Sequence, residues 1–247
     1  MIESSIHQHV CSITLNRPEK KNAFNNAAWN QFATLMEAAH TNDDVRVVVL
    51  SGAGGNFSAG VDLSDFGGDE GAAPFERAAW SVINFDKPLI GAASGIAIGG
   101  GATVLFHCDI VYVGHSLRMR LPFVNLGLVP EWASSYTLQA NIGGQRAAEL
   151  FYTAQWINAE KAVEAGIAAA QYNDAELLAK AMEKAAEIAQ WPLNSLRETK
   201  RCLKLPHAAG IKVAMDAETT GMAKQIGSPE NIEAITAFLE KRPPRFT

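Results

Sequence analysis

The feature that most limits how this chain can fold is a glycine-rich junction between two apolar runs. Residues 87–93 form a short apolar run, which predicts a buried strand. Residues 102–107 are apolar and contain no helix breaker, which predicts the start of a buried helix. Gly99, Gly100 and Gly101 lie between the two runs, where they allow a tight turn and leave backbone N–H groups uncovered. Unpaired N–H groups at a helix start can receive an oxyanion, although a turn that only packs the strand closely against the helix would need the same glycines.

Hydrophobic periodicity predicts strands alternating with helices along most of the chain, which is typical of an α/β fold. The predicted strands are residues 9–16, 45–50, 87–93 and 110–113. The predicted helices are residues 26–40, 74–85, 131–139, 145–154, 159–165, 174–190 and 229–241. Beyond Trp191 the pattern is helical only, so we expect a core domain over residues 1–191 and a C-terminal helical region over residues 192–247.

Composition excludes several classes of function. The 247 residues are 48% hydrophobic and 19% charged, which is enough to form a sizeable core, and the net charge of -5 argues against a nucleic-acid-binding surface. No run is long and apolar enough for a membrane span, and the first residues lack the pattern of a signal peptide. Cys11, Cys108 and Cys202 are odd in number and far apart, which fits reduced thiols in a cytoplasmic protein.

The motifs of common catalytic and cofactor sites are absent from the sequence. The six histidines do not combine with other ligands at metal-binding spacing, so no metal is expected. Neither a Gly-x-Ser-x-Gly elbow nor a nucleotide-binding glycine loop appears, so no nucleotide cofactor is expected. What remains is a pair of glycine turns, at Gly60 and Gly100, whose N–H donors could hold one developing oxyanion while a nearby carboxylate moves a proton.

Several short motifs stand in an order that resembles the crotonase, or enoyl-CoA hydratase/isomerase, superfamily. They are Asn16-Arg17-Pro18 with Asn22-Ala23, residues 57–62, residues 95–101, Cys108-Asp109 and residues 122–130. The resemblance runs from about residue 10 to the C-terminal helices. It implies a spiral of ββα units, a C-terminal helical trimerisation region, a homotrimer or dimer of trimers, and an acyl-CoA thioester substrate. Coenzyme A would then be part of the substrate, and no separate cofactor is expected.

The resemblance also implies a set of site residues. The backbone N–H groups of Val61 and Gly100 would form the oxyanion hole. The residues expected to bind substrate are Ser58, Ala59, Asp62, Leu63 and Phe123. From the residues alone, Asp62 is better explained as a helix N-cap.

The acid/base residues decide the reaction within this superfamily. The resemblance places the two glutamates of a typical hydratase at Thr103 and Phe123, and neither residue is acidic. Residues 126–131 and 134–137 instead resemble the Δ3,Δ2-enoyl-CoA isomerase branch, which implies that Glu131 is the single catalytic base. Without the resemblance, Glu131 would read as an exposed glutamate at a helix start.

We therefore expect a double-bond isomerase that converts 3-enoyl-CoA to 2-enoyl-CoA. The alternative reaction is hydration, or another crotonase-type reaction, with a base in the region of residues 65–76. A third possibility is a non-catalytic acyl-CoA-binding subunit that keeps the fold.

Overall fold

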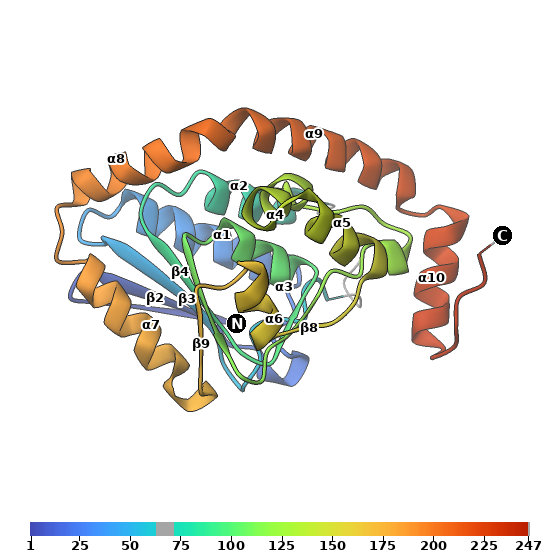
Figure 1. Ribbon diagram of the computed structural model, residues 1–247, viewed down its shortest axis with the longest axis horizontal. Helices are drawn as coiled ribbons and strands as arrows, with labels where there is room; N and C mark the ends of the chain where they lie inside the picture. The colour runs from blue at the N-terminus through green and yellow to red at the C-terminus, as the bar shows by residue number, and fades with distance from the viewer. Residues whose placement is uncertain (63–71, 247) are drawn as a thin grey trace.

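The computed structural model describes residues 1–62 and 72–246, and its centre is a six-stranded sheet (Figure 1). The strand order is β1-β2-β3-β4-β6-β9. The strands are β1 (Ile2–His7), β2 (Val10–Leu15), β3 (Val47–Gly52), β4 (Leu89–Ala93), β6 (Ile110–Gly114) and β9 (Ala170–Tyr172). Only the β1–β2 pair of this sheet is antiparallel, so the chain must cross over between successive parallel strands.

The structure also contains a three-stranded sheet, in the order β5-β7-β8. Its strands are β5 (Ile96–Ile98), β7 (Arg118–Arg120) and β8 (Ile157–Asn158). Twice in succession the chain runs from a strand of the large sheet to a strand of the small sheet and then into a helical turn. The first unit is β4, β5 and α3 (Gly100–Thr103), and the second is β6, β7 and η4 (Val124–Leu126). This repeat is the ββα winding that the sequence resemblance implies.

Helices bury both faces of the large sheet. Val47 and Val49 of β3 share a cluster with Leu177 of α7 (Asp174–Ile188) on one face. The alternate residues Val48 and Leu50 belong to the main core on the other face, under α1 (Asn26–Thr41) and α2 (Ala73–Ile83). Burial on both sides explains why β3 reads as an unbroken apolar run.

The other helices complete the crossovers and the C-terminal region. They are η1 (Pro18–Lys20), η3 (Val104–His107), α4 (Ser134–Ile142), α5 (Gly144–Thr153), α6 (Ala159–Ala165), α8 (Leu193–Lys204), η5 (Leu205–His207), α9 (Ala208–Gln225) and α10 (Pro229–Leu239). In Figure 1, α8 and α9 arch across the side of the molecule that carries α2 and α4, and α10 lies at the far end. The predicted domain boundary near Pro192 falls just before α8 and stays a prediction.

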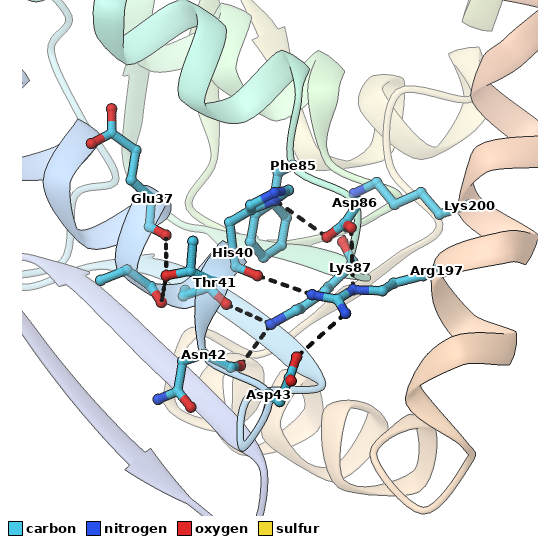
Figure 2. A network of polar contacts seen from close by, with 12 residues as sticks. Glu37, His40, Thr41, Asn42, Asp43, Phe85, Asp86, Lys87, Arg197 and Lys200 are labelled. Atoms are coloured by element: carbon cyan, nitrogen blue, oxygen red, sulfur yellow. Dashed lines mark hydrogen bonds and ion pairs between the residues drawn. The ribbon is translucent and has the colours of Figure 1, made fainter.

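Charged side chains attach α8 to the core (Figure 2). The Lys200 Nζ donates to Asp109 Oδ2 at 2.7 Å and to the Lys87 carbonyl at 2.6 Å, and the Lys200 side chain is only 3% exposed. The Arg197 guanidinium lies 3.1 Å from Asp86 Oδ2. Since these partners precede β4 and β6, the first C-terminal helix is fixed to the strand starts of the large sheet.

The structure differs from the sequence predictions at two places that matter for the site. The strand predicted over residues 9–16 is the second arm of a hairpin, because β1 precedes it. The helix predicted from residue 131 begins at Ser134, because Trp132 and Ala133 adopt left-handed backbone conformations that cannot join a helix. Among the described helices, none is long and apolar enough to cross a membrane.

Candidate active site

Two glycine turns meet at the edge of the small sheet. Gly60 has a φ of +82°, and a Cβ atom on it would lie 2.4 Å from the Ile98 carbonyl oxygen and 3.4 Å from the Gly100 nitrogen. Only glycine fits such a close approach of two backbones. The turns that the sequence analysis singled out at Gly60 and Gly100 are therefore in direct contact.

Two backbone N–H groups at this contact have no partner among the described residues. Phe24 pairs with the segment around Val61: the Phe24 N–H donates to the Gly60 carbonyl at 2.7 Å, and the Asp62 N–H donates to the Phe24 carbonyl at 2.8 Å. The Val61 N–H is therefore directed to the opposite edge of this segment. Within residues 1–62 and 72–246, neither the Val61 N–H nor the Gly100 N–H has a hydrogen-bond partner.

The Glu131 carboxyl group lies beside the Gly100 turn. A Cβ atom on Gly100 would be 3.3 Å from Glu131 Oε1, and this oxygen is buried without a hydrogen-bond partner among the described residues. Burial, and secondarily the negative charge of Glu218, raises the pKa of Glu131 to about 8. A carboxyl oxygen that is buried, has no hydrogen-bond partner among the described residues and lies beside the Gly100 turn is suited to moving a proton.

An aromatic wall accounts for the low polarity around this carboxyl group. The Trp29 Cη2 atom would lie 3.3 Å from the same Cβ position on Gly100. The Trp29 ring lies 5.4 Å from the Trp132 ring and 5.3 Å from the Phe75 ring, and it stacks on Phe24 at 3.8 Å. These rings keep water from one side of the site, which disfavours the ionised carboxylate.

The turn that follows Glu131 is held from two sides. Trp132 and Ala133 both have a φ of +56°, which is costly for residues with side chains. The Glu218 carboxylate of α9 accepts the Ala133 N–H at 2.6 Å and the Ser135 N–H at 2.9 Å. On the other side, His107 Nε2 lies 2.6 Å from the Trp132 carbonyl oxygen, so this nitrogen must be the protonated donor. Burial lowers the pKa of His107 to about 4, which keeps the ring neutral near pH 7.

Two of the residues expected to bind substrate shape the Gly60 turn. The Ser58 hydroxyl is fully buried, donates to the Asn22 carbonyl at 2.8 Å and accepts the Gly60 N–H at 3.1 Å. The Ala59 N–H donates to the Lys21 carbonyl at 2.9 Å. Ser58 and Ala59 thus hold the segment that presents Val61, and their contact with substrate stays a prediction.

The other three residues expected to bind substrate differ in their surroundings. Asp62 Oδ2 forms a buried ion pair with Arg17 Nη1 at 2.8 Å. Leu63 lies outside the described residues, and so does any helix that Asp62 would cap. Phe123 is buried, with its ring 6.2 Å from that of Phe151.

The positions considered for a hydratase arrangement are Thr103, Phe123 and the region of residues 65–76. Thr103 is buried and its hydroxyl donates to the Gly100 carbonyl at 3.3 Å, while Phe123 is part of the core. Glu76, from the region considered for an alternative base, is exposed on α2, and Asp65 lies outside the described residues. Residues 1–62 and 72–246 contain no cluster of three potential metal ligands.

The sequence analysis did not single out Glu218 or His107. Glu218 stands in the middle of a helical pattern, where a glutamate usually faces solvent. His107 ends the apolar run after the glycine triplet without a partner at recognisable spacing. Both residues contact segments far away in the chain, so no local sequence pattern predicts these contacts.

The chain is similar to known proteins of one family. The family model described as enoyl-CoA hydratase/isomerase matches residues 5–247. The chain belongs to the enoyl-CoA hydratase/isomerase family. A crystal structure of an enoyl-CoA hydratase/isomerase from Pseudoalteromonas atlantica T6c superposes with a TM-score of 0.96 at 35% identity, covering 100% of this chain and 99% of that one. The crotonase-type α/β fold is thereby confirmed.

Relatives in this hydratase/isomerase family carry names for both reactions. The 2,3-dehydroadipyl-CoA hydratase of Escherichia coli K12 is 30% identical, over 98% of this chain and 96% of its own length. Enoyl-CoA delta isomerase 2 of Rattus norvegicus is also 30% identical, over 95% of this chain and 62% of its own length. The chain is therefore an acyl-CoA enzyme of the hydratase/isomerase type, and overall identity does not choose between the two reactions.

Proposed function

We propose that the protein is a Δ3,Δ2-enoyl-CoA isomerase that uses Glu131 as its only acid/base group. The observation that carries the proposal is the position of the Glu131 carboxyl oxygen against Gly100, buried and without a hydrogen-bond partner among the described residues. Thr103 and Phe123 support it, because they stand where the resemblance places the glutamates of a hydratase. The name of the rat relative, an enoyl-CoA delta isomerase, is consistent with it.

The proposed reaction moves one proton between two carbons. The thioester oxygen binds between the Val61 and Gly100 N–H groups, and Glu131 removes a proton from C2 of a 3-enoyl-CoA. Electrons of the C2–H bond form the dienolate, whose oxygen is stabilised by the two donors. The dienolate then takes the proton back from Glu131 at C4, the double bond settles between C2 and C3, and the carboxylate is regenerated.

A raised pKa suits this double task. A base with a pKa near the working pH can both accept a proton and return it at useful rates. Glu131 has a pKa of about 8 because burial opposes its ionisation. Hydration would require groups to position and activate a water, and Thr103 and Phe123 supply no carboxylate for that purpose.

Product identification tests the proposal. The enzyme is incubated separately with 3-hexenoyl-CoA and 2-hexenoyl-CoA, and products are identified by mass and NMR. We expect conversion of the first to the 2-enoyl ester without a gain of 18 mass units, and little hydration of the second. In D₂O, deuterium at C4 should be less than complete, because a shielded carboxyl group returns part of the original proton.

Two other results would each replace the proposal. Efficient hydration of 2-hexenoyl-CoA without isomerisation would identify a hydratase with a water-activating group outside the residues discussed. Binding of a panel of enoyl-CoAs with no turnover of any would identify a non-catalytic acyl-CoA-binding subunit.

A further inference from the structure

We propose that Glu218, on the C-terminal helix α9, is a positioning residue that holds the Glu131 carboxyl group against Gly100. The inference rests on the proposed role of Glu131 as the base, and goes beyond it by assigning a function to a buried carboxylate in a different part of the chain. Glu218 is 7% exposed, although glutamates are rarely buried without a specific partner.

The first argument is the missing cap of α4. The residue before this helix is Ala133, which has no side-chain oxygen to bind the free N–H groups of the first turn. Glu218 takes that part from another helix, with Oε2 on the Ala133 N–H at 2.6 Å and Oε1 on the Ser135 N–H at 2.9 Å. Both oxygens accept hydrogen bonds at a helix start, and these bonds oppose the rise in the pKa of Glu218 that its burial causes.

The second argument is backbone strain next to the base. Trp132 and Ala133 are left-handed, and such residues persist only where their surroundings hold them. Glu218 binds the N–H of Ala133, and His107 binds the carbonyl of Trp132 from the opposite side. The residue immediately before this clamped pair is Glu131, so the clamp sets the direction in which its side chain leaves the backbone.

The third argument is electrostatic. Glu218 uses both carboxyl oxygens in hydrogen bonds, whereas Glu131 Oε1 has no partner among the described residues. Burial raises the pKa of Glu218 as well, but the hydrogen bonds from Ser135 and Ala133 oppose that rise, so Glu218 loses its proton before Glu131. The negative charge on Glu218 then raises the pKa of Glu131 in addition to burial. His107 of η3, which faces the same turn, is neutral near pH 7 because burial lowers its pKa to about 4.

Three variants separate positioning from charge. Glu218→Gln removes the charge and leaves one carbonyl oxygen for two N–H donors. Glu218→Asp keeps the charge but shortens the side chain by one methylene group. Asp216→Asn is the matched control, because it removes an exposed carboxylate from the same helix, two residues away.

The measurements are kcat, KM and the pH dependence of kcat/KM with 3-hexenoyl-CoA. For Glu218→Gln we expect kcat to fall roughly 10- to 100-fold with little change in KM, and the rising limb of the pH profile to move to lower pH. Glu218→Asp should lose kcat while keeping the limb near its original position, and Asp216→Asn should match the unchanged enzyme. A folded Glu218→Gln protein with unchanged kcat or an unmoved limb would overturn the proposal.

A direct titration keeps this test independent of the reaction. The side-chain carboxyl carbons of glutamate are labelled with ¹³C, and the Glu131 signal is assigned with Glu131→Gln. The Glu131 carboxyl should titrate at higher pH than Glu218 in the unchanged protein, and at lower pH in Glu218→Gln than in the unchanged protein. If 3-hexenoyl-CoA is not isomerised, the proposed function fails, while these titrations still decide the role of Glu218. If Glu218→Gln does not fold, a Glu131 midpoint at or below that of Glu218 in the unchanged protein is the result that overturns the role.

Discussion

The chemical character of Glu131 follows from the surroundings of its Oε1 atom, which is buried and has no hydrogen-bond partner among the described residues. A surface carboxylate is solvated and ionised at neutral pH, but Glu131 Oε1 has neither water access nor a hydrogen bond from a described residue. The absence of a compensating partner keeps its pKa near 8 instead of in the acidic range. Burying such a group without a partner costs free energy. A residue that bears this cost is a strong candidate for a role in the reaction.

Replacing this carboxyl group should stop the chemistry and preserve binding. Glu131→Gln keeps the size of the side chain but cannot accept the C2 proton. We expect kcat to fall by about 10²–10⁴-fold, the usual contribution of a general base, with the affinity for an acyl-CoA largely retained. The measurements are steady-state kinetics with 3-hexenoyl-CoA and calorimetric binding of the product. Near-normal turnover by this variant would move the base elsewhere.

The pH dependence should follow the raised pKa. The base acts when it is deprotonated, so kcat/KM should rise by about tenfold per pH unit below the pKa and level off above it. Since burial raises the pKa of Glu131 to about 8, the change of slope should fall near that pH. A profile already flat between pH 5 and pH 7, measured over the range in which the protein stays folded, would contradict this assignment.

Turnover should be sensitive to an added side chain at Gly100 and insensitive to a shortened side chain at Val61. Gly100→Ala would place a Cβ atom 3.3 Å from both Glu131 Oε1 and Trp29 Cη2, so we expect kcat to fall roughly 10- to 100-fold through displacement of the base. Val61→Ala should have a mild effect, because Val61 acts through its N–H group. Gly144→Ala is the control, since its Cβ would be 3.8 Å from its nearest neighbour. A severe loss in folded Val61→Ala would refute the backbone role.

Among single residues, the sequence predicts those site residues that belong to a recognisable motif. Val61, Gly100 and Glu131 stand in recognisable order, and the structure brings the two glycine turns and the carboxyl group together. Glu218 and His107 follow no motif, because their partners are main-chain atoms of a turn far away in sequence. Residue type and spacing cannot report a contact whose other half is a backbone group.

Among the secondary-structure elements, long periodic helices and buried strands are the predictable part. The predicted helix over residues 26–40 appears as α1 and the predicted strand over residues 110–113 as β6, each within a residue at either end. β1 escapes prediction because five of its six residues are exposed, which removes the hydrophobic alternation. The short strands β5, β7 and β8 also escape, because pairing with distant strands, not local pattern, makes them strands.

The attachment of α8 yields a test of stability. Lys200→Ala would leave the Asp109 carboxylate and the Lys87 carbonyl without their buried cation, so we expect a loss of about 1–3 kcal/mol in the free energy of unfolding. The measurement is denaturant unfolding followed by circular dichroism. Lys180→Ala is the control: it breaks an exposed ion pair with Glu183 on α7 and should leave the midpoint unchanged. Equal midpoints for both variants would show that the buried cation is dispensable.

For the whole molecule, the notable feature is the set of exposed apolar side chains on the C-terminal helices. Val213, Ile232, Phe238 and Leu239 of α9 and α10 are 57–68% exposed. Three of these four lie on α10, and the structure leaves them uncovered in the single chain. An apolar surface of this kind is typical of a protein–protein interface.

We expect this surface to be covered in a homotrimer or a dimer of trimers. Light scattering at micromolar concentration should give three or six chain masses. Phe238→Glu should shift the mass downward, since burying a charge in an apolar contact is costly. Leu178→Glu, at a 47% exposed position on α7, is the control and should leave the mass unchanged. A monomer mass for the unaltered protein would contradict the expectation.

The attachment of α8 also has a consequence for the order of events during synthesis. Lys200 reaches an aspartate 91 positions earlier in the chain, and Arg197 reaches Asp43, 154 positions earlier. On the ribosome, the Lys200 ammonium becomes available to the Asp109 carboxylate and the Lys87 carbonyl only after translation has passed residue 200, and water can solvate both groups until then. The contacts that fix α8 to the strand starts therefore form late in the synthesis of this protein.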